Sequence, residues 1–151
     1  MNYQLKKFQD LSLDELYGIF ILRQEVFVVE QNCAYLDADG KDQASYHLMG
    51  KDEDNEILSY CRLLPSGTSY PNYTSIGRVI SSAKIRGTGE GKRLLENAIA
   101  ETRKLWPGIS IKISAQCYLE NFYASFGFVS EGQPYEEDSI PHIAMVLNER
   151  S

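Results

Sequence analysis

The 151-residue sequence predicts one mixed α/β domain, and three observations carry that prediction. A strand-like run at 75–81 leads through a glycine-rich turn into an amphipathic helix at 92–105. Isoleucine alternates with polar residues over 109–113, as in a half-buried strand. No repeat, linker or low-complexity run divides the chain. We therefore expect a single domain over residues 1–151, with a mixed, mostly antiparallel twisted sheet of six to seven strands flanked by helices.

The first elements follow from local patterns near the N-terminus. Residues 4–8 are expected to form a strand. Ser12 and Glu15 have the spacing of a capping box, which predicts that a helix begins there. Apolar residues continue that helix at helical spacing, namely Leu13, Leu16, Tyr17, Phe20, Ile21 and Phe27. The stretch 33–43 has no apolar period and is expected to be a loop.

The remaining elements alternate strands with two helices. Strands are expected at 45–51 and 57–64, before the strand that leads into the glycine-rich turn. The helix behind that turn should end before Pro107 and Gly108, which favour helix termination. A short helix is expected at 119–126, followed by strands near 128–131 and 143–147. The predicted order is β-α-β-β-β-α-β-α-β-β.

The glycine-rich turn, Arg86-Gly87-Thr88-Gly89-Glu90-Gly91, is the clearest chemical signal in the sequence. Glycines let backbone N–H groups approach a phosphate, and a helix N-terminus favours negative charge. Two nucleotide motifs do not fit. A P-loop requires Ser or Thr where this chain has Arg93, and a dinucleotide fingerprint requires the spacing G-x-G-x-x-G. The turn is therefore predicted to bind an anion of another kind.

This turn resembles the R-x-x-G-x-G/A loop of the GCN5-related N-acetyltransferases (GNAT), which cradles the pyrophosphate of acetyl-CoA; the motif falls on Arg86, Gly89 and Gly91. The segment 121–128 is similar to the second cofactor motif of that superfamily, a short helix that ends in Gly-Phe. Segments 23–31 and 135–142 are similar to parts of its ElaA-like branch. Because the four segments occur in this order over most of the chain, the resemblance implies a GNAT-like domain throughout.

The resemblance also implies roles for particular residues. The backbone of the strand before the loop would hold the pantetheine arm and polarise the thioester carbonyl. Tyr123 matches the general acid that protonates the departing thiolate; the alternative is an aromatic core position in a short amphipathic helix. Asn121 matches a cofactor-contacting asparagine or, alternatively, a helix cap. The side chain of Glu90 is expected to point outward. The expected cofactor-binding residues are Val79, Ile80, Ser81, Arg86, Gly87, Thr88, Gly89, Glu90, Gly91, Lys92, Asn121 and Tyr123.

The general base is left open between several side chains or a chain of water molecules. The candidates are Glu30, Asp37, Asp39, His47, Glu136, Glu137 and His142, of which Glu30 and His142 are preferred. Gln31, Arg78 and Glu136 are expected to contact the acceptor. Arg78 is placed one residue before a strand bulge, where it either anchors an acceptor carboxylate or pairs with an acid. Arg23 either braces its helix or reaches the acceptor, and Cys117 is interpreted as structural.

Composition limits the partners and the compartment. Fifteen basic and twenty-one acidic residues give a formal net charge of -6, which disfavours nucleic acid and anionic membranes and slightly favours a cationic acceptor. Three widely spaced cysteines and two histidines predict neither a disulfide framework nor a metal site. No segment has the pattern of a signal peptide or membrane span, so a cytoplasmic protein is expected, as a monomer or homodimer.

The sequence therefore predicts an acetyl-CoA-dependent N-acetyltransferase that acts by direct transfer to a primary amine of a small molecule or peptide. Two alternatives remain open. One is a non-catalytic acyl-CoA-binding or sensor module. The other comes from the segment 26–31, which also resembles the N-terminal helix of acyl-homoserine-lactone synthases.

Overall fold

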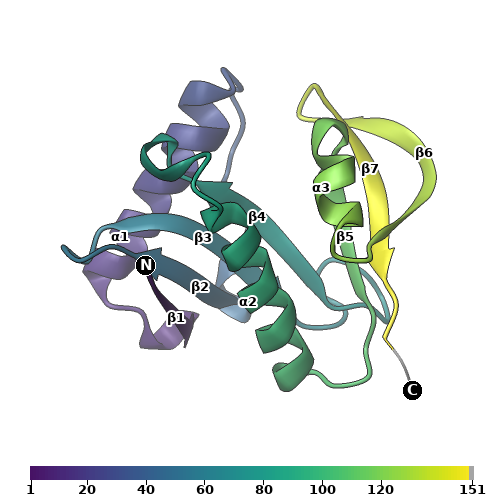
Figure 1. Cartoon of the computed structure of the whole chain (residues 1–151), viewed down its shortest axis with the longest axis horizontal. Coiled ribbons are helices and arrows are strands. Elements are labelled where there is room, and N and C mark those ends of the chain that lie inside the picture. The colour runs from purple at the N-terminus through teal and green to yellow at the C-terminus, as the bar shows by residue number, and fades with distance from the viewer. Residues whose placement is uncertain (150–151) are drawn as a thin grey trace.

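The computed structural model describes residues 1–149, and its element order is the predicted one (Figure 1). The strands and α-helices are β1 (Asn2–Lys7), α1 (Leu13–Arg23), β2 (Tyr46–Lys51), β3 (Ile57–Leu64), β4 (Ser75–Ser81), α2 (Glu90–Leu105), β5 (Ile111–Gln116), α3 (Glu120–Ala124), β6 (Val129–Glu137) and β7 (Ile140–Leu147). The mixed α/β fold class is confirmed. Helix α2 begins two residues earlier than predicted, so Glu90 and Gly91 belong to its first turn.

The strands fall into two antiparallel sheets, ordered β1-β2-β3-β4 and β5-β7-β6. The sheets are joined where Thr74 forms a parallel bridge with Ile111, through backbone hydrogen bonds of Thr74 N to Ser110 O (3.1 Å) and Lys112 N to Thr74 O (2.9 Å). Beyond this bridge β4 and β5 diverge (Figure 1). The divergence leaves one edge of β4 without a strand partner within residues 1–149, and this edge borders the cleft described below.

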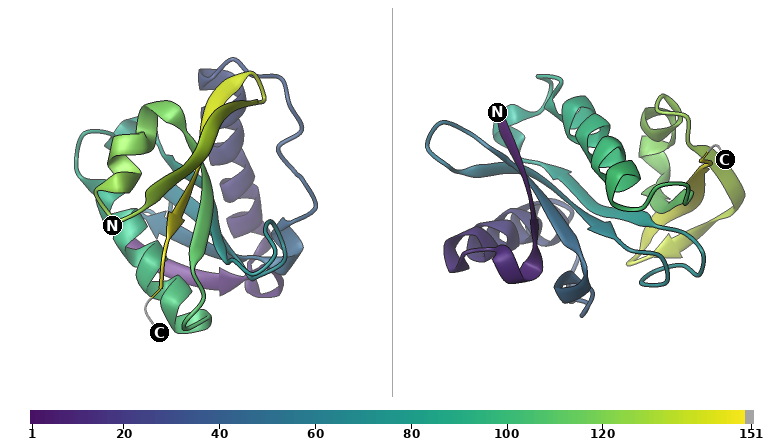
Figure 2. Two further views of the ribbon diagram at one scale, coloured as in Figure 1. Left: turned by 90° about the vertical axis from the view of Figure 1, so that its right-hand side faces the viewer. Right: turned by 90° about the horizontal axis from the view of Figure 1, so that it is seen from below.

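Helices cover both faces of the first sheet (Figure 2). On one face α2 packs through Leu94, Leu95, Ala98 and Ile99 onto a core that continues under α3 and into the second sheet. On the other face α1 packs through Ile19 and Leu22 against β2, β3 and β4. Not all of the apolar residues at helical spacing in α1 face the core, because Leu13 and Tyr17 are 86% and 71% exposed. The buried face of α1 instead includes two charged side chains, Glu15 and Arg23.

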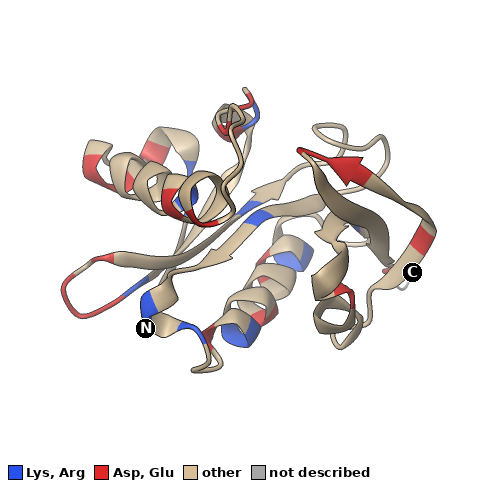
Figure 3. Ribbon diagram, turned by 90° about the horizontal axis from the view of Figure 1, so that it is seen from above, with Lys and Arg blue, Asp and Glu red and all other residues tan. Residues whose placement is uncertain are grey.

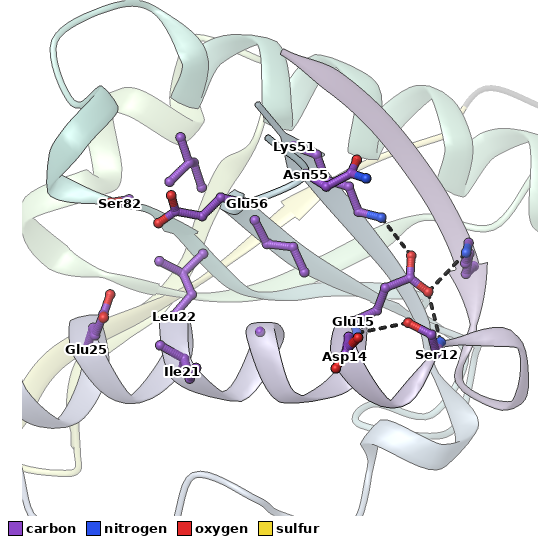
Figure 4. Close-up of a pocket in the computed structure, with 14 residues that line it drawn as sticks. Ser12, Asp14, Glu15, Ile21, Leu22, Glu25, Lys51, Asn55, Glu56 and Ser82 are labelled. Atoms are coloured by element: carbon purple, nitrogen blue, oxygen red, sulfur yellow. Dashed lines mark hydrogen bonds and ion pairs between the residues drawn. The ribbon is translucent and has the colours of Figure 1, made fainter. Parts of the chain in front are cut away.

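Both buried charges of α1 are paired, which makes their burial possible. Ser12 and Glu15 form the predicted capping box, with Ser12 N donating to Glu15 Oε1 at 2.8 Å. The same carboxylate accepts a hydrogen bond from Lys51 of β2 at 2.7 Å (Figure 4). Burial alone would raise the pKa of Glu15, but Lys51, Ser12 and Lys6 lower it to about 2. This group lines a cavity of about 540 Å³ between α1 and the β2–β3 hairpin.

The segment after α1 continues as a π-helix over Gln24–Glu30. Its hydrogen bonds span five residues, as from Gln31 N to Val26 O at 3.2 Å. Such wider turns are often found at functional sites, since they change which side chains face a cleft. An irregular stretch follows, with one 3-10 turn at Asp42–Ala44, so the predicted loop is confirmed.

The C-terminal hairpin differs from the prediction. Strand β6 extends to Glu137, whereas the sequence predicted a strand only near 128–131. Glu137 pairs with Ile140, and Asp138 and Ser139 form the two-residue turn with positive φ values of 51° and 64°. Because β6 is an exposed edge strand with a register shift after Glu131, it lacks the apolar alternation of a buried strand.

No helix within residues 1–149 is long and apolar enough to cross a membrane. In the same range Cys33, Cys61 and Cys117 are free thiols, and no group of three His, Cys, Asp or Glu side chains is arranged to hold a metal ion.

Candidate active site

A cleft of about 610 Å³ lies where β4 and β5 separate. We distinguish two groups of residues around it. The loop side consists of the β4 edge, the glycine-rich turn, the start of α2 and the nearby helix α3. The hairpin side consists of the π-helical segment, the irregular stretch behind it and the β6–β7 hairpin, and it contributes Phe27, Glu30, Gln31, Cys33, Tyr35, Glu137, Asp138, Ile140 and His142 to the cleft.

A bulge in β4 shapes the floor of the cleft. Tyr60 pairs with Ile80 and Arg62 with Gly77, so Arg78 and Val79 together face one residue of β3. The strain is taken by Arg78, whose φ is 51°. Arg78 therefore lies within the bulge, not one residue before it as predicted. Val79, Ile80 and Ser81 all line the cleft, and their edge backbone groups have no strand partner in the described chain.

The glycine-rich turn delivers the start of α2 to the cleft. Gly87 and Gly89 have φ values of 80° and 86°, a region that other residues rarely adopt. No side chain caps α2. The hydrogen bond from Arg93 N to Gly89 O closes the first turn of the helix. The preceding N–H groups of Glu90, Gly91 and Lys92 are the unsatisfied donors of a helix N-terminus. This end of α2 can therefore bind an anion.

The two charged side chains of the turn have different partners. The Glu90 carboxylate accepts a hydrogen bond from the Tyr3 hydroxyl of β1 at 2.6 Å, and it forms an ion pair with Arg93 at 2.9 Å. These contacts lower the pKa of Glu90 and hold its charge against β1. Arg86 donates from Nε to Ser81 O at 3.1 Å and pairs through Nη1 with Glu30 at 2.6 Å. The Arg86–Glu30 pair thus joins the loop side to the hairpin side.

Tyr123 projects from α3 into the cleft and is 7% exposed. Its ring makes edge contacts with Phe122 and Phe128, at centroid distances of 5.4 and 6.0 Å. Burial, and secondarily Cys61 and Tyr118, raise the pKa of its hydroxyl well above the ordinary value. The hydroxyl is therefore protonated at neutral pH, and it can donate a proton to a group placed in the cleft.

His142 is the buried polar side chain of the hairpin side. It is 7% exposed and stacks on Tyr135 with a centroid distance of 6.2 Å. Its Nδ1 lies 2.7 Å from Ile140 O, and a carbonyl oxygen only accepts, so Nδ1 carries the proton of the neutral ring. The lone pair is then on Nε2, which lies 3.5 Å from the Glu137 carboxylate. This geometry leaves a proton acceptor at the cleft.

A buried ionic network anchors the irregular stretch beneath the hairpin side. Arg23, which is fully buried, pairs with Asp37 at 2.6 Å and Asp42 at 2.7 Å. Arg62 of β3 shares Asp42 at 3.0 Å and also binds Asp39. Burial would raise the pKa of Asp42, but the arginines hold it below its usual range. Arg23 therefore braces its helix, which is one of the two roles predicted for it.

The same network occupies several of the candidate bases. Arg78 lies 2.9 Å from Asp37 and 3.4 Å from Asp39, so it pairs with acids within the chain. His47 is buried, with Nδ1 2.6 Å from the Tyr60 hydroxyl and Nε2 2.9 Å from Asp42 O. Burial lowers the pKa of His47, and both of its nitrogens are bonded. Asp37, Asp39 and His47 are therefore not available as a base at the cleft.

Some predicted site residues lie beside the cleft and not on its wall. Arg86 and Gly91 line it, whereas Gly87, Thr88, Gly89, Glu90 and Lys92 lie behind them in the turn and first helical turn. Asn121 is exposed in α3, whose cap is Leu119, so it is not a helix cap. On β6 Glu137 lines the cleft, and Glu136 does not. Gln31 lines it and accepts a hydrogen bond from Gln116 at 3.4 Å.

Sequence reasoning missed the aromatic and polar groups that complete the cleft wall. Phe27 and Tyr35 lie over the Arg78 guanidinium, at 5.9 and 5.7 Å from ring centroid to carbon. Ser114 of β5 hydrogen-bonds the Tyr135 hydroxyl. The residues 135 and 137 on β6 share the two-residue period of a strand, which is the signal that would have separated Glu137 from Glu136. For Tyr35 the sequence carries no comparable signal.

Comparison with known proteins gives a consistent result. Residues 9–149 match the family model described as an acetyltransferase (GNAT) domain. The chain is 43% identical to a UPF0039 protein of Synechocystis, over 97% of this chain and 95% of that protein. It is 42% identical to protein ElaA of Escherichia coli, over 90% and 89%, and the crystal structure of that ElaA superposes with a TM-score of 0.90. The crystal structure of an acyl-CoA N-acyltransferase from Pseudomonas aeruginosa also gives 0.90, at 40% identity, covering 97% and 99%.

Proposed function

The chain belongs to the GNAT acetyltransferase family and is an ElaA-like acyltransferase, and from this premise we propose that it transfers an acetyl group from acetyl-CoA directly to a primary amine. The observation that carries the proposal is the meeting, at one cleft, of an uncapped helix N-terminus and a bulged strand edge that has no strand partner in the described chain. The first suits a pyrophosphate, and the second suits the amide-containing pantetheine arm.

The donor is held by backbone groups and one side chain. The N–H groups at the start of α2 bind the pyrophosphate, and Arg86 adds a charge-assisted contact after release from Glu30. Gly91 leaves space at this point, because an added Cβ would meet no atom closer than Ser81 Oγ at 3.9 Å. The edge of β4 over residues 79–81 orients the thioester and places a backbone donor near its carbonyl oxygen. Bound acetyl-CoA supplies the activated acetyl group.

The transfer requires two proton movements. The amine nitrogen bonds to the acetyl carbon, and the carbon–sulfur bond breaks. His142 Nε2 accepts the proton that the amine loses, directly or through water, and Glu137 stabilises the resulting imidazolium. Tyr123 donates its proton to the departing sulfur. Burial raises the pKa of the Tyr123 hydroxyl above that of an ordinary phenol, so it keeps its proton until the sulfur leaves as a thiolate.

Calorimetry with acetyl-CoA tests the donor site. Gly91→Val should weaken acetyl-CoA binding by at least about tenfold, because the side chain would occupy the space that the pyrophosphate needs. The folded chain should tolerate it, since Gly91 lies in a helix and its φ is not positive. Equal thermal stability of both proteins is the control. Unchanged affinity in a folded variant would remove the donor site from this turn.

Activity is measured by release of free thiol with a panel of amines. Turnover above the solvolysis blank with at least one amine supports the transferase. Tight binding of acetyl-CoA with no turnover on any amine or peptide would instead favour the sensor module that the sequence left open.

A further inference from the structure

The charged groups that face the cleft are unequally satisfied. Two arginines line it, and each already has an acidic partner: Arg78 is held by Asp37 and Asp39, and Arg86 by Glu30. On the hairpin side the carboxylates of Glu137 and Asp138 also line it, and no arginine or lysine pairs with them in the described chain. Figure 3 shows acidic residues at the tip of the β6–β7 hairpin. The uncommitted charge in the cleft is negative.

Binding of the donor increases this imbalance. When Arg86 turns to the pyrophosphate, as the proposed function requires, Glu30 loses its partner at 2.6 Å. Arg78 cannot replace it, because its guanidinium is fixed by Asp37 and packed beneath Phe27 and Tyr35. The acceptor then meets three carboxylates and no free cation on the cleft wall. A carboxylate on the acceptor would be desolvated without a partner, which is costly.

A second observation points to a ligand at the same place. The side chain of His142 is only 7% exposed. Its Nδ1 is hydrogen-bonded to Ile140 O, and its Nε2 makes no hydrogen bond within residues 1–149. The Glu137 carboxylate lies 3.5 Å from Nε2, and neither atom donates a hydrogen bond to the other while the imidazole is neutral. The nitrogen is not among the buried polar atoms that lack a partner, so it remains accessible at the cleft wall to a ligand. An amine N–H in the cleft would satisfy it.

We propose that the acceptor is a small diamine or polyamine: an amine with a second cationic group and no carboxylate. This inference rests on the proposed function and specifies its substrate class. The reacting amine lies at His142, and the second cation lies between Glu137 and Asp138, with Glu30 nearby once Arg86 has been drawn away. The aromatic faces of Phe27 and Tyr35 border the alkyl chain.

Matched pairs of acceptors test the class. Putrescine and 4-aminobutyrate share a four-carbon chain, and cadaverine differs from lysine only by the carboxylate. We expect kcat/KM to be at least about tenfold higher for the diamine of each pair, since the carboxylated member places a negative charge among the acidic side chains of the cleft. Equal rates, or faster reaction of the carboxylated member, would overturn the substrate class and leave the transferase intact. No turnover of any amine would overturn the transferase itself.

Two neighbouring glutamates provide the variant and its control. Glu137→Gln should reduce the preference for putrescine over butylamine by about fivefold or more, because it removes the charge that binds the second cation. Because both amines react at His142, any effect of the substitution on His142 changes both rates alike and cancels in the ratio of their kcat/KM values. Glu136→Gln changes the same charge on the same strand outside the cleft, so the ratio should stay constant. A change of equal size in both variants would show that only the overall charge matters.

Discussion

The two sides of the cleft are built in different ways. The loop side presents backbone groups, namely the uncapped N-terminus of α2 and the free edge of β4. The hairpin side presents side chains from three segments, of which the irregular stretch is held in place by the buried pairs of Arg23 with Asp37 and Asp42. Backbone sites depend on glycine spacing and strand breaks, so they are local. Side-chain sites depend on tertiary pairing. The first kind is thus suited to a constant ligand, and the second to one that differs between relatives.

The largest effect should come from Tyr123, a side chain on the loop side. Tyr123→Phe should lower kcat by about 10²- to 10⁴-fold, because it removes the proton for the departing sulfur while keeping the ring contacts with Phe122 and Phe128. The affinity for acetyl-CoA should change less than about twofold. Both are read from steady-state thiol release and calorimetry. A parallel loss of affinity and turnover would assign Tyr123 to binding and blur the contrast between backbone and side-chain sites.

Breaking the buried network should cost stability and impair the hairpin side selectively. Asp42→Asn removes the carboxylate charge that the buried guanidinium groups of Arg23 and Arg62 share. This loss should lower the free energy of unfolding by about 3 kcal/mol. Urea unfolding measures this, with Asp10→Asn at an exposed 3-10 turn as the control. At a temperature where the variant remains folded, KM for the amine should rise and the Kd of acetyl-CoA should not. A rise in both would show that the network supports the whole cleft.

The attachment of α1 should depend on pH through Glu15. The pKa of this group is about 2 in the folded chain and near 4.5 when it is free, so its ion pair with Lys51 stabilises the fold above pH 4.5. That stability is lost as the pH falls from about 5 to 2. Glu15→Gln should therefore cost up to about 3 kcal/mol at pH 7 and almost nothing near pH 2.

Unfolding at several pH values checks this, with the exposed Glu96→Gln as the control. A deficit that is the same at pH 7 and pH 3 would mean that Glu15 acts through its capping hydrogen bonds and not through its charge. In that case α1 would be anchored by backbone contacts, like the loop side.

The contrast also explains what the sequence could and could not predict. The element order and the glycine-rich turn were predictable, because each depends on residues close together in the chain. The buried face of α1 was not, since Glu15 and Arg23 are buried by partners 36 and 14 to 19 residues away. The extension of β6 was hidden for a related reason: its side chains are exposed, so no apolar period marks it. On the hairpin side the sequence supplied only a list of candidate bases. The structure shows that Asp37 and Asp39 are paired with arginines, whereas Glu137 and His142 line the cleft.

The smallest effect tests the single ion pair that connects the two sides. Glu30 competes with the pyrophosphate for Arg86, so Glu30→Gln should strengthen acetyl-CoA binding by about two- to fivefold. The gain is modest because both side chains are partly exposed, at 46% and 37%. Acetylpantetheine lacks the pyrophosphate and should bind both proteins equally. Raised salt should shrink the difference, since it screens exposed charges. If the variant bound acetyl-CoA more weakly, Glu30 would be holding Arg86 in the binding position, and the two sides would cooperate where we expect them to compete.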